Sequence, residues 1–74
     1  MEYLDLHNTS HADAEILIEN FIFKNYKKLP IKIITGNSLT MINILKKIVE
    51  NNNLRMSVPH LNNLGSYIIN NKIN

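Results

Sequence analysis

The segment Ile31–Thr35 constrains the fold most strongly, because its residues are β-branched at every position except Lys32. β-branched side chains favour extended backbone, and a short run of them is typical of a buried strand. Leu29 and Pro30 precede this segment, and proline disfavours helical geometry at the residue before it. We therefore expect a buried strand that starts just after a helix has ended.

Segments with helical periodicity flank this strand on both sides. Apolar residues recur at helical spacing from about Ala12 to Lys27, and again from Leu39 to Asn51. Ser10 and Ser38 stand just before these segments, where N-cap residues are expected. The predicted buried faces are Ala14, Leu17, Ile18, Phe21 and Ile22 in the first helix, and Met41, Ile42, Ile44, Leu45, Ile48 and Val49 in the second.

Three further segments have the composition of strands: Glu2–Leu6, Leu54–Val58 and Ser66–Ile69. Two β-α-β units imply parallel strands, and the short last connection implies an antiparallel return. We predict one α/β (α+β) domain over residues 1–74, a two-layer sandwich of a four-stranded mixed sheet and two helices in the order β-α-β-α-β-β. The tail Asn70–Asn74 is expected to fray.

Composition narrows the class of protein. The formal net charge is +2 and the chain has no cysteine, which excludes a disulfide framework and a thiolate metal site. No apolar run approaches the about 20 residues that a membrane-spanning helix needs. The N-terminus has no basic region ahead of an apolar stretch, so we expect no signal peptide. These features predict a soluble, cytoplasmic protein with no membrane partner.

The predicted order of elements brings three connections together. Parallel strands finish at the same edge of a sheet, so Asp5–His11, Thr35–Ser38 and His60–Gly65 are expected to meet there, where open α/β sheets usually bind ligands. Two helix N-termini also open at this edge, and their free N–H groups suit a phosphate. His7 suits general acid or base catalysis, since its reference pKa is about 6.5. Asp5, two residues earlier on the strand, is expected on the same face.

Simpler interpretations stay open for each of these residues. An Asp-x-His segment can serve only to cap a helix or a loop, and Thr35–Ser38 alone is an ordinary turn. Asp5, His7 and His11 together are a candidate for a divalent metal, but their spacing matches no strong ligand pattern, so no cofactor is evident. On the first helix, Ile16 and Phe23 project from the face opposite the predicted core. They are either isolated exposed side chains or a contact for a weak homodimer or another protein partner.

Three blocks of the chain resemble the small MutS-related (Smr) domain family. They are Asp5-Leu6-His7-Asn8, Ile33-Ile34-Thr35-Gly36-Asn37-Ser38 and Asn63-Leu64-Gly65-Ser66. The family's blocks read D-L-H-G, I-I-T-G-K-G and a glycine-containing N-x-G or G-x-G. The resemblance extends from about Tyr3 to Asn70. This chain departs from the family at Asn8, where the family has glycine, and at Asn37 and Ser38, where it has lysine and glycine.

The resemblance implies a fold and a function. Smr domains are two-layer α/β sandwiches that bind DNA or RNA, and several are endonucleases. By this resemblance Asp5 and His7 are the candidate catalytic residues. The candidate nucleic-acid-binding residues are His11, Thr35, Gly36, Asn37, Ser38, His60, Asn63 and Gly65. The predicted function is therefore nucleic-acid binding with phosphodiester cleavage, and the alternatives are a non-catalytic DNA- or RNA-binding module or a small protein-interaction domain.

Overall fold

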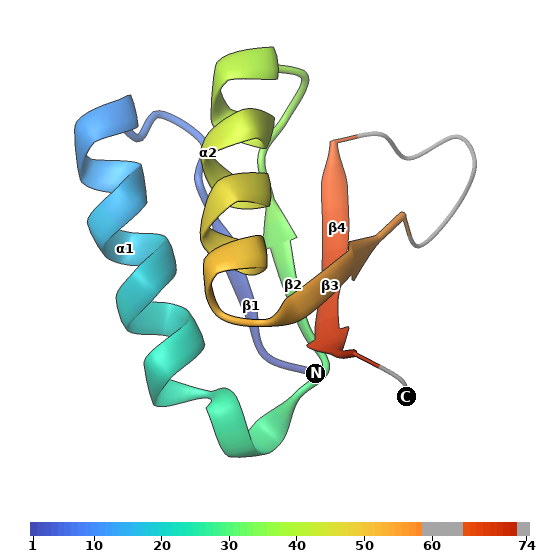
Figure 1. Cartoon of the computed structure of the whole chain (residues 1–74). Helices are drawn as coiled ribbons and strands as arrows, with labels where there is room; N and C mark the ends of the chain where they lie inside the picture. Colours follow the sequence, from blue (N-terminus) through green and yellow to red (C-terminus); the bar gives the residue numbers. More distant parts are fainter. Residues whose placement is uncertain (59–64, 73–74) are drawn as a thin grey trace.

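The computed structural model describes residues 1–58 and 65–72 (Figure 1). The elements follow in the order β1 (Tyr3–Asp5), α1 (His11–Lys24), a short 3-10 helix η1 (Tyr26–Lys28), β2 (Ile31–Ile34), α2 (Leu39–Asn51), β3 (Leu54–Ser57) and β4 (Ser66–Asn71). The predicted fold class, with two α-helices and a four-stranded mixed sheet, is confirmed.

The sheet has the strand order β1-β2-β4-β3. β1 pairs in parallel with β2, while β4 is antiparallel to both β2 and β3. β1, β2 and β3 therefore run in one direction, and β4 fills the space between β2 and β3. The parallel and antiparallel pairings agree with the sequence prediction. The sequence pattern did not indicate that the last strand lies inside the sheet.

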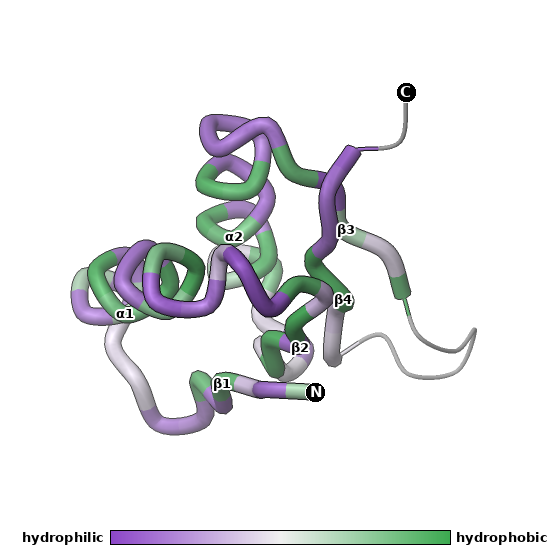
Figure 2. The backbone as a smooth tube through the Cα atoms, turned by 90° about the horizontal axis from the view of Figure 1, so that it is seen from below, coloured by the Kyte–Doolittle hydropathy of each residue, from purple (hydrophilic) through white to green (hydrophobic). Residues whose placement is uncertain are grey.

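Both helices cover the same face of the sheet (Figures 1 and 2). Ile31 and Ile33 of β2 point into the layer between sheet and helices, and both are fully buried. The rest of this core consists of Leu6, Ala14, Ile18, Ile22, Met41, Leu45, Ile48, Val49, Leu54 and Ile69. Burial of apolar area at this single layer is the main stabilising contribution available to so small a chain.

The buried stripe of α1 is narrower than predicted. Ala14, Ile18 and Ile22 are buried at a spacing of four residues, and Phe21 borders them. Leu17, which we expected in the core, is 41% exposed. In α2 the prediction is closer, because Met41, Leu45, Ile48 and Val49 are buried, and Ile42 and Ile44 are half-buried.

The first helix ends three residues earlier than predicted, at Lys24 instead of Lys27. Asn25 is the C-cap residue, and its backbone N–H and its side-chain amide both donate to the carbonyl of Phe21, at 3.1 and 2.9 Å. Asparagine is disfavoured in helix interiors, so it suits this terminal position. The chain then tightens into η1, where the Lys28 N–H donates to the Asn25 carbonyl at 2.8 Å.

The strand ends also differ slightly from the prediction. β1, β2 and β3 are each shorter than expected, and β4 is longer, since Asn70 and Asn71 pair with Arg55 and Leu54 instead of fraying.

Across the described residues, no helix is long and apolar enough to cross a membrane.

Two isoleucines on α1 provide a matched test of this packing. Ile18 is fully buried, whereas Ile16 is 61% exposed. We expect Ile18→Val to lower the free energy of unfolding by about 0.5–1.5 kcal/mol, and Ile18→Ala by about 2–5 kcal/mol. Ile16→Ala removes the same atoms from the same helix and should change the free energy of unfolding by less than about 0.5 kcal/mol. Urea denaturation followed by circular dichroism measures both, and equal losses at the two positions would contradict this packing.

Candidate functional site

The connections that follow β1 and β2 lie at the end of the sheet where β4 starts, next to Gly65 (Figure 1). The Leu6 N–H donates to the Ile34 carbonyl at 2.9 Å, which joins the first connection to the end of β2. The N–H groups of Thr35 and Gly36 both donate to the Gly65 carbonyl, at 2.8 and 3.0 Å. The parts of the three sequence blocks that the structure describes are therefore in direct contact, as the order of elements predicted.

The turn after β1 is held by the Asp5 side chain and by a buried leucine. Asp5 Oδ1 accepts the His7 N–H at 2.9 Å, and Leu6 between them is 2% exposed. Asn8 follows with φ 60°, in the left-handed region that asparagine tolerates better than most residues. Asparagine is therefore compatible with the backbone conformation of this turn.

Asp5 and His7 lie close together, but not as two residues of one strand. β1 ends at Asp5, and His7 lies in the turn. His7 Nδ1 is 3.6 Å from Asp5 Oδ1, which is longer than a hydrogen bond. The two side chains are 72% and 49% exposed, so the imidazole is accessible to a ligand and the carboxylate can contact it after a small rotation. The expectation that both groups lie together is met, although the direct hydrogen bond of Asp5 is to the turn backbone.

The turn between β2 and α2 is tied to the start of β4. Thr35 is buried, and its hydroxyl donates to the Gly36 carbonyl at 2.9 Å and lies 3.3 Å from the Gly65 carbonyl. Gly36 has φ +68°, a conformation that favours glycine. A Cβ on Gly65 would lie 3.3 Å from Gly36 Cα, so the close approach of the two segments depends on Gly65, whereas Gly36 is needed for its positive φ.

Both helices begin at this end, each with a serine N-cap. Ser10 Oγ accepts the Asp13 N–H at 3.1 Å, and Ser38 Oγ accepts the Met41 N–H at 3.2 Å. The first two amides of each helix, those of His11 and Ala12 and of Leu39 and Thr40, have no acceptor within their own helix. They remain for water or a ligand, at the positive end of each helix dipole.

The remaining predicted residues have different outcomes. Asn37 is exposed in the β2–α2 turn, and His11 is exposed as the first residue of α1. The trio Asp5, His7 and His11 is not assembled as a metal site, since no group of three metal-ligating side chains is close enough within the described ranges. His60 and Asn63 lie outside the residues that the structure describes.

One residue at this end was missed by the sequence analysis. Ser66, the first residue of β4, is 3% exposed, and its hydroxyl has no hydrogen-bond partner within residues 1–58 and 65–72. A buried hydroxyl normally has such a partner. Its sequence position beside Gly65 marked it as part of the third block, but no pattern in the sequence indicated that it is buried.

Comparison of this chain with models of protein families, with curated proteins and with solved structures gives no match. The resemblance to Smr domains therefore stays a prediction that depends on the three blocks and on their convergence in the fold.

Gly36 offers a test of the turn geometry. Gly36→Ala places a Cβ at a positive φ, which costs about 1–2 kcal/mol in this conformation. We expect a net loss of about 1 kcal/mol in the free energy of unfolding, because alanine also restricts the unfolded chain. Asn37→Ala, at the exposed next position, should stay within about 0.5 kcal/mol of wild type. Urea denaturation measures both, and an unchanged Gly36→Ala variant would contradict the positive φ.

Proposed function

We propose that this chain binds nucleic-acid phosphates at the end of the sheet where β1 and β2 finish. The observation that carries the proposal is a series of backbone hydrogen bonds. The turn at Asp5–Asn8 bonds to Ile34 at the end of β2, and the turn at Thr35–Ser38 that follows bonds to Gly65. Together with the resemblance of these blocks to Smr domains, this convergence favours a shared role in ligand binding over three unrelated turns.

The helix N-termini support a phosphate as the ligand. α1 and α2 start at this same end (Figure 1), and each leaves two amides beyond the reach of its serine cap. Backbone N–H groups and the positive ends of two helix dipoles favour an anion. Asn37, exposed between them, adds an amide that can donate to a phosphate oxygen.

Charge limits the affinity of this site. Asn37 stands where the Smr pattern has a lysine, and Asp5 adds a half-exposed carboxylate. Phosphate contacts dominate nucleic-acid affinity through the release of counterions, so each missing cation weakens binding. The proposal therefore implies modest affinity with a shallow salt dependence.

Restoring a cation at the turn tests this site. Asn37→Lys should tighten binding roughly tenfold, since a hydrogen bond from a charged donor contributes about 1.5 kcal/mol or more. It should also steepen the plot of log K against log salt by about 0.7 for a single strand. Fluorescence anisotropy with labelled oligonucleotides from low to high salt measures both quantities.

Asn71→Lys is the matched control, because it adds the same charge at the last residue of β4, away from the turns. If both variants tighten binding equally, the gain comes from net charge alone. That outcome would count against a site at the β2–α2 turn.

Phosphodiester cleavage is a second candidate function at the same end. It is favoured by the exposed His7 imidazole with Asp5 Oδ1 3.6 Å from its Nδ1. In such a reaction His7 would move a proton to or from the reacting oxygen, while Asp5 would orient the ring and stabilise its protonated form.

Cleavage is tested with purified protein on supercoiled plasmid, single-stranded RNA and branched DNA, each with added magnesium and with chelator. We expect His7→Ala to lower the rate by about 10²–10⁴-fold, the usual contribution of general acid–base catalysis. Glu50→Ala, an exposed residue near the C-terminal end of α2, is the control and should keep most of the activity. Equal background cleavage by wild type and His7→Ala, with binding intact, would leave only the binding function.

A further inference from the structure

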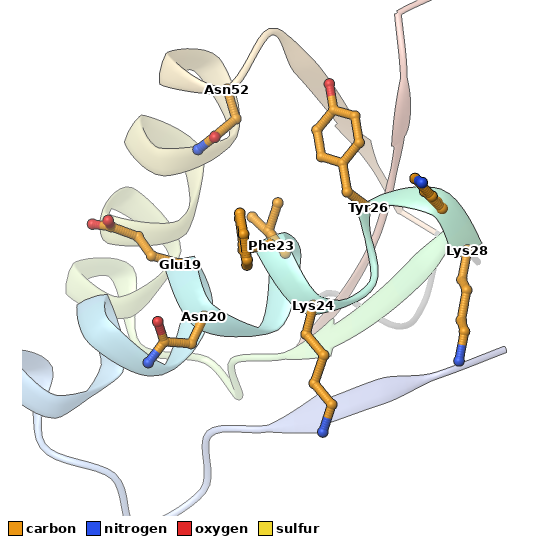
Figure 3. Close-up of a pocket in the computed structure, with 9 residues that line it drawn as sticks. Glu19, Asn20, Phe23, Lys24, Tyr26, Lys28 and Asn52 are labelled. Carbon is orange, nitrogen blue, oxygen red and sulfur yellow. The ribbon is translucent and has the colours of Figure 1, made fainter.

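A groove of about 890 Å³ lies at the opposite end of the molecule, between the C-terminal ends of α1 and α2 (Figure 3). Its walls include Phe23 and the 3-10 helix η1 on one side and Asn52, the C-cap of α2, on the other. None of these residues belongs to the three blocks discussed above. The groove is therefore separate from the site at the carboxyl ends of β1 and β2.

Two aromatic side chains line this groove without being part of the core. Phe23 is 86% exposed and Tyr26 is 49% exposed. Figure 3 shows both rings on the side of the chain that faces Asn52. An exposed phenylalanine is unremarkable alone. Two exposed rings three residues apart in one hollow form a surface on which flat apolar groups can stack.

Three lysines accompany the rings, because the local sequence reads Phe-Lys-Asn-Tyr-Lys-Lys from Phe23 to Lys28. Lys24, Lys27 and Lys28 all line the groove and are exposed. Figure 3 shows Lys24 and Lys28 extending away from the rings, so these lining side chains border the groove at its rim instead of filling it. Glu19 is the one acidic residue among those that line the groove, so cations outnumber it.

Each of the two helices that end at this groove has an asparagine C-cap. Asn25 donates two hydrogen bonds to the Phe21 carbonyl. Asn52 donates its backbone N–H to α2 carbonyls and its side-chain amide to the Ile48 carbonyl at 2.8 Å. The two side-chain amides place N–H donors at the negative ends of the helix dipoles, which partly offsets those dipoles at the groove.

We propose that this groove is a second nucleic-acid site, selective for single strands. Unpaired bases stack on Phe23 and Tyr26, and the phosphates contact Lys24, Lys27 and Lys28 on the rim. Proteins that bind single strands without sequence preference combine a basic groove with aromatic stacking platforms in this way. A duplex keeps its base faces stacked internally and cannot use the rings, so it should bind more weakly. The inference depends only on the groove residues, not on the site proposed above.

Charge favours this occupant over a second copy of the chain. Two copies joined through the groove would bring six lysine ammonium groups together, and like charges at an interface disfavour association. A polyanion neutralises the same groups. Self-association through Phe23 is nevertheless a distinct outcome that the experiment can detect.

Binding of a fluorescently labelled single strand and of the matching duplex is measured by anisotropy for the full chain. Phe23→Ala should weaken single-strand binding about 5- to 150-fold, which corresponds to about 1–3 kcal/mol for loss of one stacked base. Replacing Lys24, Lys27 and Lys28 together by glutamine should lower the slope of log K against log salt by about 2. Duplex binding should be weaker than single-strand binding in wild type and insensitive to Phe23→Ala.

Matched controls separate the groove from general effects. Ile16→Ala truncates another exposed apolar residue of α1 that does not line the groove. Replacing Lys46 and Lys47 by glutamine removes exposed cations from α2, outside the groove. Neither control replacement should weaken the single-strand binding that depends on stacking. Circular dichroism verifies that all variants keep the fold. Amide chemical shifts on titration with a tetranucleotide should move at residues 19–28 and at Asn52.

Asn37→Glu, which places a negative charge at the β2–α2 turn, distinguishes failure of this inference from failure of the proposed function. Loss of binding in the groove variants supports the inference whatever Asn37→Glu does. If Asn37→Glu loses nucleic-acid binding while the groove variants keep full binding, the groove proposal is overturned and the proposed function stands. Absence of any nucleic-acid binding overturns both. Unchanged binding together with a dimer that Phe23→Ala dissociates, as measured by sedimentation, overturns it in favour of self-association.

Discussion

The structure depends on the burial of one face of a small sheet beneath two helices. Ile31 and Ile33 of β2 are fully buried in this layer, and Ile18 of α1 and Leu45 of α2 pack into it from the other side. A chain of 74 residues has little apolar area beyond this one layer to offset the entropy of ordering the backbone. Within the described residues, no helix lies over the other face of the sheet, which includes Tyr3 and Lys32 (Figure 2).

This layer also determines where the ends of the helices lie. Each helix carries the chain back from the carboxyl end of one parallel strand to the start of the next. Both helix N-termini are therefore at the end where β1 and β2 finish, and both C-termini are at the opposite end (Figure 1). At the end with the helix N-termini, free N–H groups and short turns lie near His7 and Gly36. At the end with the helix C-termini, lysines and exposed aromatic rings lie near Tyr26. The two proposed sites follow from this polarity, and both suit a polyanion for different physical reasons.

Sequence reasoning succeeded where a pattern is local. The bounds of α2 and the caps at Ser10 and Ser38 agree with the sequence prediction. Prediction failed where packing or hydrogen bonding overrides a local pattern. Leu17 has helical spacing but lies beyond the edge of the stripe that the sheet can cover. α1 ends at Lys24 with Asn25 as its C-cap, a boundary that the apolar periodicity does not mark.

The sequence by itself determined the kinds of element, their order, and hence the meeting of Asp5–Asn8 with Thr35–Ser38, because parallel strands joined by helices must finish at one edge. Only the tertiary structure decided that β4 lies between β2 and β3. That position puts the Gly65 carbonyl in contact with the amides of Thr35 and Gly36. The tertiary structure also decided that the segment from Phe23 to Lys28 lines a groove with Asn52. Strand order and grooves arise from contacts between residues far apart in the chain, and local sequence patterns do not predict those contacts.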